Sequence, residues 1–149
     1  MQNKNLLKLY MNDVGLLSNI LYRNNTKPIL ETVRSVNLGA LYETVVASQL
    51  KALDHNLFYY DNRSNGEVDF LIDDYENLAV LPIEVKSGRD YMIHSAINKF
   101  LSNPDYPVVR GVVLSNDREI KTVGKITYYP IYLIMFFKSS VDYGKDLLL

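Results

Sequence analysis

Two short segments, residues 66–70 and 82–88, carry charged side chains within otherwise apolar, strand-like sequence. Residues two apart in a strand share one face of a sheet, so Glu84 and Lys86 are expected to point the same way. If the segments form neighbouring strands, Asp69 converges with them on one patch of one sheet face. The two segments therefore predict a sheet that holds two carboxylates and one ammonium around a single point.

The same alternation assigns the other side chains of the first segment. Glu67 is expected on the face of Asp69, whereas Val68 and Phe70 are expected together on the opposite face. The acidic stretch at residues 73–77 is expected to form the turn between the two strands. One face of this hairpin would then be polar near Asp69 and the other apolar.

Periodic apolar patterns along the chain predict alternating helices and strands. Asp13 and Asn37 are expected to cap two N-terminal helices, since short polar side chains accept hydrogen bonds from free backbone N–H groups. The expected elements are, in order, a helix after Asp13, a helix at 38–53, strands at 57–60, 68–72 and 78–86, a helix at 92–101, strands at 108–114 and 126–129, and a closing helix at 130–137. This order predicts an α/β sandwich with a mixed central sheet flanked by helices.

The composition excludes several kinds of site. The chain of 149 residues and 17.1 kDa is long enough for one domain, residues 1–149, with its own core. It has no cysteine, which excludes disulfides, thiol chemistry and cysteine-bound zinc. The two histidines, His55 and His94, are too few for a histidine-rich metal site, and His94 is expected to be solvated on a helix surface. Any bound metal is therefore expected to have oxygen ligands.

Net charge and hydropathy limit where the protein is expected to be located and what it is expected to bind. A formal net charge of −1 counts against strong DNA binding by charge alone. The N-terminus does not have the pattern of a signal peptide, and the most apolar stretch, residues 128–137, is shorter than the roughly 18 residues of a membrane helix. We therefore expect a cytoplasmic protein without a membrane partner.

Glu43, Asp69 and the run Glu84-Val85-Lys86 follow one another on a predicted helix and two predicted strands. In this order they resemble the PD-(D/E)XK signature of restriction endonucleases and archaeal Holliday junction resolvases. The resemblance implies a restriction-endonuclease-like α/β/α sandwich that hydrolyses DNA. Taken alone, Glu43 at the edge of an apolar helix stripe is more simply an ordinary glutamate that reaches solvent, and its partner motifs favour the site.

Hydrolysis of a phosphodiester bond assigns a role to each of these residues. Asp69 and Glu84 are expected to be direct ligands of Mg²⁺ or Mn²⁺, with the Val85 carbonyl completing the ligand set. Glu43 is expected to bind a second ion or to orient a water molecule. Lys86 is expected to position the attacking water and to stabilise developing negative charge.

Four segments, residues 8–17, 38–43, 66–70 and 82–88, resemble the C-terminal domain of unknown function that many prokaryotic AAA-class P-loop ATPases carry. The resemblance implies that an ATPase module and a winged-helix segment precede this domain. The sequence contains no Gly-x-x-x-x-Gly-Lys-Ser/Thr phosphate loop. We therefore expect the chain to be the C-terminal part of a longer protein, with those segments as its partners.

Two other interpretations remain open. In the first, the fold is a catalytically silent adaptor that binds nucleic acid or a protein; Glu84 and Lys86 then form a partly buried ion pair, and Asp69 caps a turn. In the second, the apolar stretch at residues 130–137 mediates homo-oligomerisation. The second interpretation is compatible with either a nuclease or an adaptor.

Overall fold

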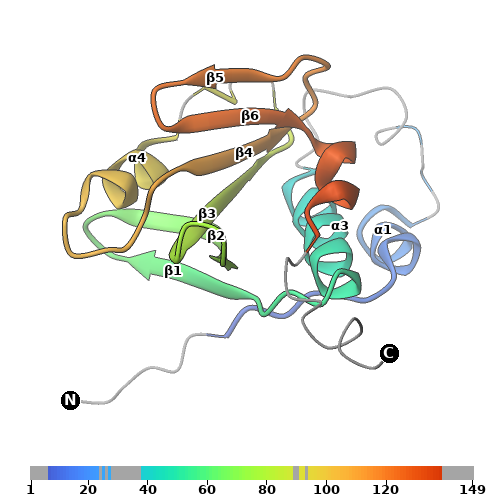
Figure 1. Cartoon of the computed structure of the whole chain (residues 1–149). Helices are drawn as coiled ribbons and strands as arrows, with labels where there is room; N and C mark the ends of the chain where they lie inside the picture. The colour runs from blue at the N-terminus through green and yellow to red at the C-terminus, as the bar shows by residue number, and fades with distance from the viewer. Residues whose placement is uncertain are drawn as a thin grey trace, which may run out of the picture.

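The structure is a computed structural model that describes residues 7–23, 25, 27, 38–88, 91–92 and 94–138. Its elements are shown in Figure 1. They are the helices α1 (Val14–Tyr22), α3 (Gly39–Ala52) and α4 (Ser95–Ser102), the 3-10 helix η1 (Ile131–Phe136), and the strands β1 (Phe58–Asn62), β2 (Gly66–Asp74), β3 (Ala79–Lys86), β4 (Gly111–Ser115), β5 (Lys121–Val123) and β6 (Ile126–Pro130).

The strands form one six-stranded mixed sheet in the order β1-β2-β3-β4-β6-β5. β1, β2 and β3 form an antiparallel meander, β3, β4 and β6 run parallel, and β5 returns antiparallel to β6. α4 connects β3 to β4 and makes the crossover that two parallel neighbours need. The prediction of an α/β fold with a mixed central sheet is confirmed.

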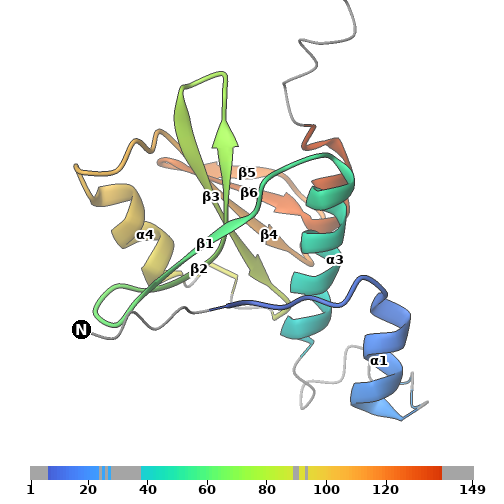
Figure 2. The same ribbon diagram turned by 90° about the horizontal axis from the view of Figure 1, so that it is seen from below.

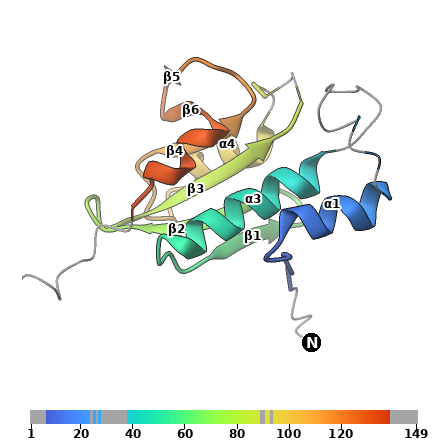
Figure 3. The ribbon, with the colours of Figure 1, turned by 90° about the vertical axis from the view of Figure 1, so that its right-hand side faces the viewer.

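Helices cover both faces of the sheet (Figures 1 and 3). α3 and η1 pack on one face in an apolar cluster that includes Leu50, Ile83 and Ile134, which we call the α3-side core. α4 packs on the other face in a cluster that includes Ile97 and Val113, the α4-side core. α1 lies beside α3 on the outside of the molecule (Figure 3). None of the described helices is long and apolar enough to cross a membrane.

A local capping signal explains where α1 begins, but not where α3 and α4 begin. Asp13 caps α1 as predicted, and its Oδ1 accepts a hydrogen bond from the Leu16 N–H at 2.9 Å. The residue before α3 is Leu38, whose side chain makes no capping bond, while the predicted cap, Asn37, lies outside the described residues. α4 begins at Ser95, later than the apolar pattern from residue 92 indicated. The predicted helices are therefore present, with a shifted start in α4.

Two C-terminal elements differ from the prediction. β5 is not predicted, because its three residues are all exposed and show no apolar alternation. The closing helix is the short 3-10 helix η1, in which Ile134 is buried. A tight 3-10 turn is sufficient where Ile134, with the partly buried Ile131, anchors the segment to the α3-side core.

β2 contains an irregularity that changes the direction of its side chains. Phe58 pairs with Leu71, and the next pair is Tyr60 with Val68. Between these two pairs β1 advances by two residues and β2 by three. The extra residue makes a β-bulge, and Val68 packs in the α4-side core whereas Phe70 packs in the α3-side core. The prediction that Val68 and Phe70 share one face is wrong, because alternation holds only in a regular ladder.

A paired carboxylate anchors the end of the β2–β3 hairpin. The buried Asp74 accepts hydrogen bonds from Asn77 Nδ2 at 2.9 Å and from Arg110 Nε at 3.1 Å. Burial by itself would raise the pKa of Asp74, but these hydrogen bonds and the charge of Arg110 outweigh it and lower the pKa below its usual value. The ionised carboxylate therefore stabilises the folded chain.

Asp74→Asn is expected to lower the free energy of unfolding by about 1–2 kcal/mol at neutral pH, since the Arg110 partner is half-exposed and the pair is partly screened. A lowered pKa adds stability above the unfolded-state pKa of about 3.9 and loses it as the pH falls through the folded pKa. The deficit should therefore shrink as the pH falls below about 3.9. Urea unfolding at neutral pH and at an acidic pH below that value measures the deficit, with the exposed Asp61→Asn as the control; an equal deficit at both pH values would contradict a role of the charge.

Candidate functional site

Asp69 lies at the bulge of β2, beside the last residue pair of the β2–β3 ladder. That pair is Phe70 with Ile83, and beyond it the Asp69 side chain replaces the backbone as the partner of β3. Its Oδ2 accepts a hydrogen bond from the Val85 N–H at 2.8 Å. The carboxylate is thereby fixed next to the strand that carries the predicted Glu-x-Lys motif.

The surroundings of Asp69 disfavour its negative charge. The side chain is 16% exposed. Burial, together with the nearby charges of Glu43 and Glu84, raises the pKa of Asp69 to about 6, although the Val85 N–H and the charge of Lys8 oppose this. Asp69 is therefore a poorly solvated carboxylate that a bound cation would stabilise.

Glu84 and Lys86 form an ion pair on β3, with Lys86 Nζ 2.5 Å from Glu84 Oε1. The flanking Ile83 and Val85 pack in the α3-side core, so Glu84 points to the side of the sheet that α4 covers. Glu84 is only 5% exposed, and its second oxygen, Oε2, has no hydrogen-bond partner among the described residues. Since a buried carboxylate oxygen without a partner is costly, this atom indicates a place for a cation or a water molecule.

Glu43 approaches Asp69 from α3. It is half-buried, and its Oε2 lies 3.5 Å from the Tyr10 hydroxyl, which donates to it. The Tyr10 ring packs on Phe70 with 5.4 Å between ring centroids. Burial, with the negative charges of Glu43 and Asp69, raises the pKa of Tyr10 to about 12 against the opposing charge of Lys8. Tyr10 therefore keeps its proton and remains a donor to Glu43.

Lys8 is a site residue that the sequence analysis missed. Its Nζ contacts the Glu67 carboxylate, lies 3.7 Å from Asp69 Oδ1, and sits 5.5 Å from the centroid of the Tyr59 ring. Burial would lower the pKa of Lys8, but the contact with Glu67 and the neighbouring negative charges raise it, so the ammonium stays charged. In the sequence Lys8 is a lone charge in an apolar run, and no local pattern links it to the distant hairpin.

The predicted residues meet only in part. Asp69 and Glu43 gather with Lys8 beside α3, whereas Glu84 and Lys86 pair on the α4 side of β3. The bulge removes Asp69 from regular alternation, yet the charges of both Glu43 and Glu84 still act on it. Asp69 also does not cap a turn, since its bond goes to a strand. Within the described parts of the chain, no three histidine, aspartate or glutamate side chains form a group that could hold a metal ion.

The donor atoms nevertheless suit a hard divalent cation. Mg²⁺ is usually bound through one or two carboxylates and keeps water or phosphate oxygens as its other ligands. Asp69 and Glu84 supply two carboxylates from adjacent strands, and the charge of Glu84 acts on Asp69. Glu84 Oε2, which has no hydrogen-bond partner among the described residues, is the kind of oxygen that such a cation binds. These two residues therefore fit Mg²⁺ or Mn²⁺.

His94 is buried, and the expectation of a solvated histidine on a helix surface is wrong. It is 6% exposed, immediately precedes α4, and its Nε2 lies 2.5 Å from the Tyr128 hydroxyl. Because α4 begins only at Ser95, His94 lies at the junction of the helix with the sheet. His94 is thus a packing and hydrogen-bonding partner of Tyr128.

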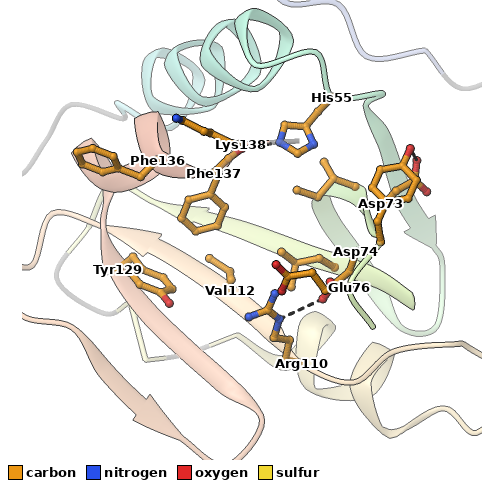
Figure 4. A pocket seen from close by; sticks show the side chains of 13 residues that line it. His55, Asp73, Asp74, Glu76, Arg110, Val112, Tyr129, Phe136, Phe137 and Lys138 are labelled. Atoms are coloured by element: carbon orange, nitrogen blue, oxygen red, sulfur yellow. Dashed lines mark hydrogen bonds and ion pairs between the residues drawn. The ribbon is translucent and has the colours of Figure 1, made fainter. Parts of the chain in front are cut away.

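A cavity of about 240 Å³ lies away from these residues, between the end of β2, β4 and η1 (Figure 4). Three of its polar side chains already have partners: Arg110 binds Asp74, and His55 Nε2 lies 2.5 Å from the Phe137 carbonyl oxygen. Asp74 is five residues from Asp69 along β2, or about 16 Å at about 3.3 Å per residue. The cavity is therefore separate from the candidate site.

Comparison with known proteins identifies the family. A search of curated proteins and a search of solved structures each gave no match. A family model described as "Domain of unknown function (DUF4143)" matches residues 38–134, a segment that covers more than half of the chain and contains Glu43, Asp69 and Glu84. The chain therefore belongs to the DUF4143 family of domains of unknown function.

Proposed function

We propose that this chain is a nuclease domain of restriction-endonuclease-like fold, which hydrolyses DNA phosphodiester bonds with Mg²⁺ or Mn²⁺. The observation that carries the proposal is the buried Glu84 carboxylate, with one oxygen on Lys86 and the other without a partner in the described part of the chain. The poorly solvated Asp69 on the adjacent strand supports it. Titratable groups held in such unfavourable surroundings are typical of functional sites.

The proposal assigns a task to each residue of the site. Asp69, Glu84 and the Val85 carbonyl hold the cation, which when bound neutralises phosphate charge and acidifies a water ligand. Lys86 stabilises the negative charge that develops on the phosphate. Glu43 orients a water molecule or contributes to a second ion, since it lies near enough to Asp69 for their charges to interact.

We further propose that an ATPase module and a winged-helix segment of an AAA-class protein act together with this domain on cytoplasmic DNA. The similarity of residues 8–17 and 82–88 to the C-terminal domains of such ATPases supports this. The formal net charge of −1 also supports it, because a domain without a basic excess gains from partners that grip the DNA backbone.

The test is cleavage of linear, nicked, single-stranded and branched DNA by the native chain with Mg²⁺ or Mn²⁺. Lys86→Met is expected to slow cleavage by about a hundredfold, since it removes one stabilising group from the transition state. Lys121→Met is the matched control, because Lys121 is exposed on β5 at the opposite edge of the sheet from β1 and β2. Equal cleavage by both variants would contradict the role of Lys86.

A catalytically silent adaptor is the second candidate. It is favoured by the existing pairing of Lys86 with Glu84 and by the lack of a group of three metal-binding side chains within the described residues. Such a module would bind nucleic acid or a protein partner without hydrolysis. Calorimetry with Mn²⁺ separates the two candidates, since absence of both metal binding and cleavage would leave only the adaptor.

A further inference from the structure

The N-terminal segment at residues 7–13 passes over the candidate site before α1 begins. Figure 2 shows it running past β1 and β2 and crossing α3. Two of its side chains reach the candidate ligands: Lys8 Nζ lies 3.7 Å from Asp69 Oδ1, and the Tyr10 hydroxyl lies 3.5 Å from Glu43 Oε2. The segment is therefore in direct contact with two of the carboxylates that the proposed nuclease uses.

We propose that Lys8 is an internal cation of this site, which neutralises Asp69 in the metal-free chain and leaves it when a divalent cation binds. This inference rests on the proposed metal-dependent function. The Lys8 ammonium contacts Glu67 and faces Asp69, so it supplies positive charge where two carboxylates would otherwise repel each other. A divalent cation on Asp69 would be repelled by an ammonium at that distance, and the two cations therefore compete.

The structure allows Lys8 to move without unfolding the site. Its ammonium ends a long flexible stem, and the side chain is 23% exposed. The flanking Leu7 and Leu9 are 76% and 84% exposed, so little packing holds the backbone there. Tyr10 remains anchored by its ring contact with Phe70. Lys8 can thus swing toward solvent while the rest of the segment stays in place.

Mn²⁺ titration calorimetry of the full chain tests the competition. Lys8→Met keeps the apolar stem and removes the charge, and it is expected to bind Mn²⁺ about tenfold more tightly than the native chain, because no ammonium has to be displaced. Lys121→Met changes the net charge equally at the far edge of the sheet and should bind as the native chain does. Circular dichroism melts confirm that each variant is folded.

A second measurement needs no substitution. The native chain is treated with acetic anhydride with and without Mn²⁺, and acetylation of each lysine is quantified by peptide mass spectrometry. Acetylation of Lys8 is expected to rise severalfold with Mn²⁺, because the displaced amine becomes accessible, while that of the exposed Lys121 stays constant. This readout is independent of any cleavage activity.

The outcomes separate the inference from the function on which it rests. Tighter binding by Lys8→Met together with metal-dependent acetylation of Lys8 in the native chain supports the inference, and so does Mn²⁺ binding by that variant alone. Mn²⁺ binding of equal affinity in native chain and Lys8→Met, with unchanged acetylation of Lys8, overturns it and leaves the metal site intact. Absence of Mn²⁺ binding in both chains overturns the metal site and the inference together.

Discussion

Asp69→Asn is expected to reduce metal-dependent DNA cleavage by about a thousandfold, because loss of a metal-binding charge removes several kcal/mol of transition-state stabilisation. The asparagine oxygen can still accept the Val85 N–H, so the link between β2 and β3 is preserved. The substitution also removes a buried negative charge close to Glu43 and Glu84. The free energy of unfolding in metal-free buffer is therefore not expected to fall.

Asp73→Asn is the matched control for this prediction. Asp73 is a half-buried aspartate of the same strand, four residues further along β2 and close to the hairpin turn, where its Oδ2 accepts a hydrogen bond from the Tyr75 hydroxyl. Its cleavage rate should equal that of the native chain. Single-turnover cleavage and urea unfolding of both variants give the two readouts. Full activity in Asp69→Asn would remove Asp69 from the proposed mechanism, and a loss of stability would show that its charge supports the fold.

Phe70→Ala is expected to give the largest loss of stability among these substitutions, about 3–5 kcal/mol in the free energy of unfolding. Phe70 is 1% exposed, lies in the α3-side core, and also supports the Tyr10 ring. Its truncation leaves a cavity next to the bulge and releases the N-terminal segment from the sheet. Tyr10 would then lose its apolar contact above Glu43.

Phe58→Ala provides a control of the same chemistry. Phe58 on β1 is 57% exposed, so its truncation removes little buried surface and should change the free energy of unfolding by less than about 1 kcal/mol. Urea unfolding of both variants measures the difference. Similar losses of stability in the two variants would contradict the assignment of Phe70 to the α3-side core. They would also contradict the conclusion that the bulge turns Phe70 toward that core.

Most of the element order is readable from local signals. Asp13 caps its helix through a bond to a residue three positions away, and the α4 crossover follows from apolar patterns within one segment. Where the signal is weak, the prediction fails. β5 consists of three exposed residues and becomes a strand only because β6 lies beside it. His94 is buried because the sheet brings Tyr128 to it, and no pattern near His94 in the sequence indicates that contact.

The sequence predicts which residues form the candidate site better than it predicts how these residues are arranged. The sequence motif names Asp69, Glu84 and Lys86, and the structure places Asp69 and Glu84 on adjacent strands with Lys86 paired to Glu84. The sequence could not show the bulge at Asp69, since a bulge depends on how β1 pairs with β2. It could not show Lys8 either, because the contact joins residues far apart in the chain.

The sequence by itself determined the α/β class, the helix and hairpin order and the residue types that the site contains, because these follow from periodicity, capping and spacing within short segments. Only the tertiary structure decided that Val68 and Phe70 face opposite cores and that Lys8 Nζ lies 3.7 Å from Asp69 Oδ1. The physical reason is that strand register and long-range charge pairing arise when separate segments pack together, and no single segment encodes them.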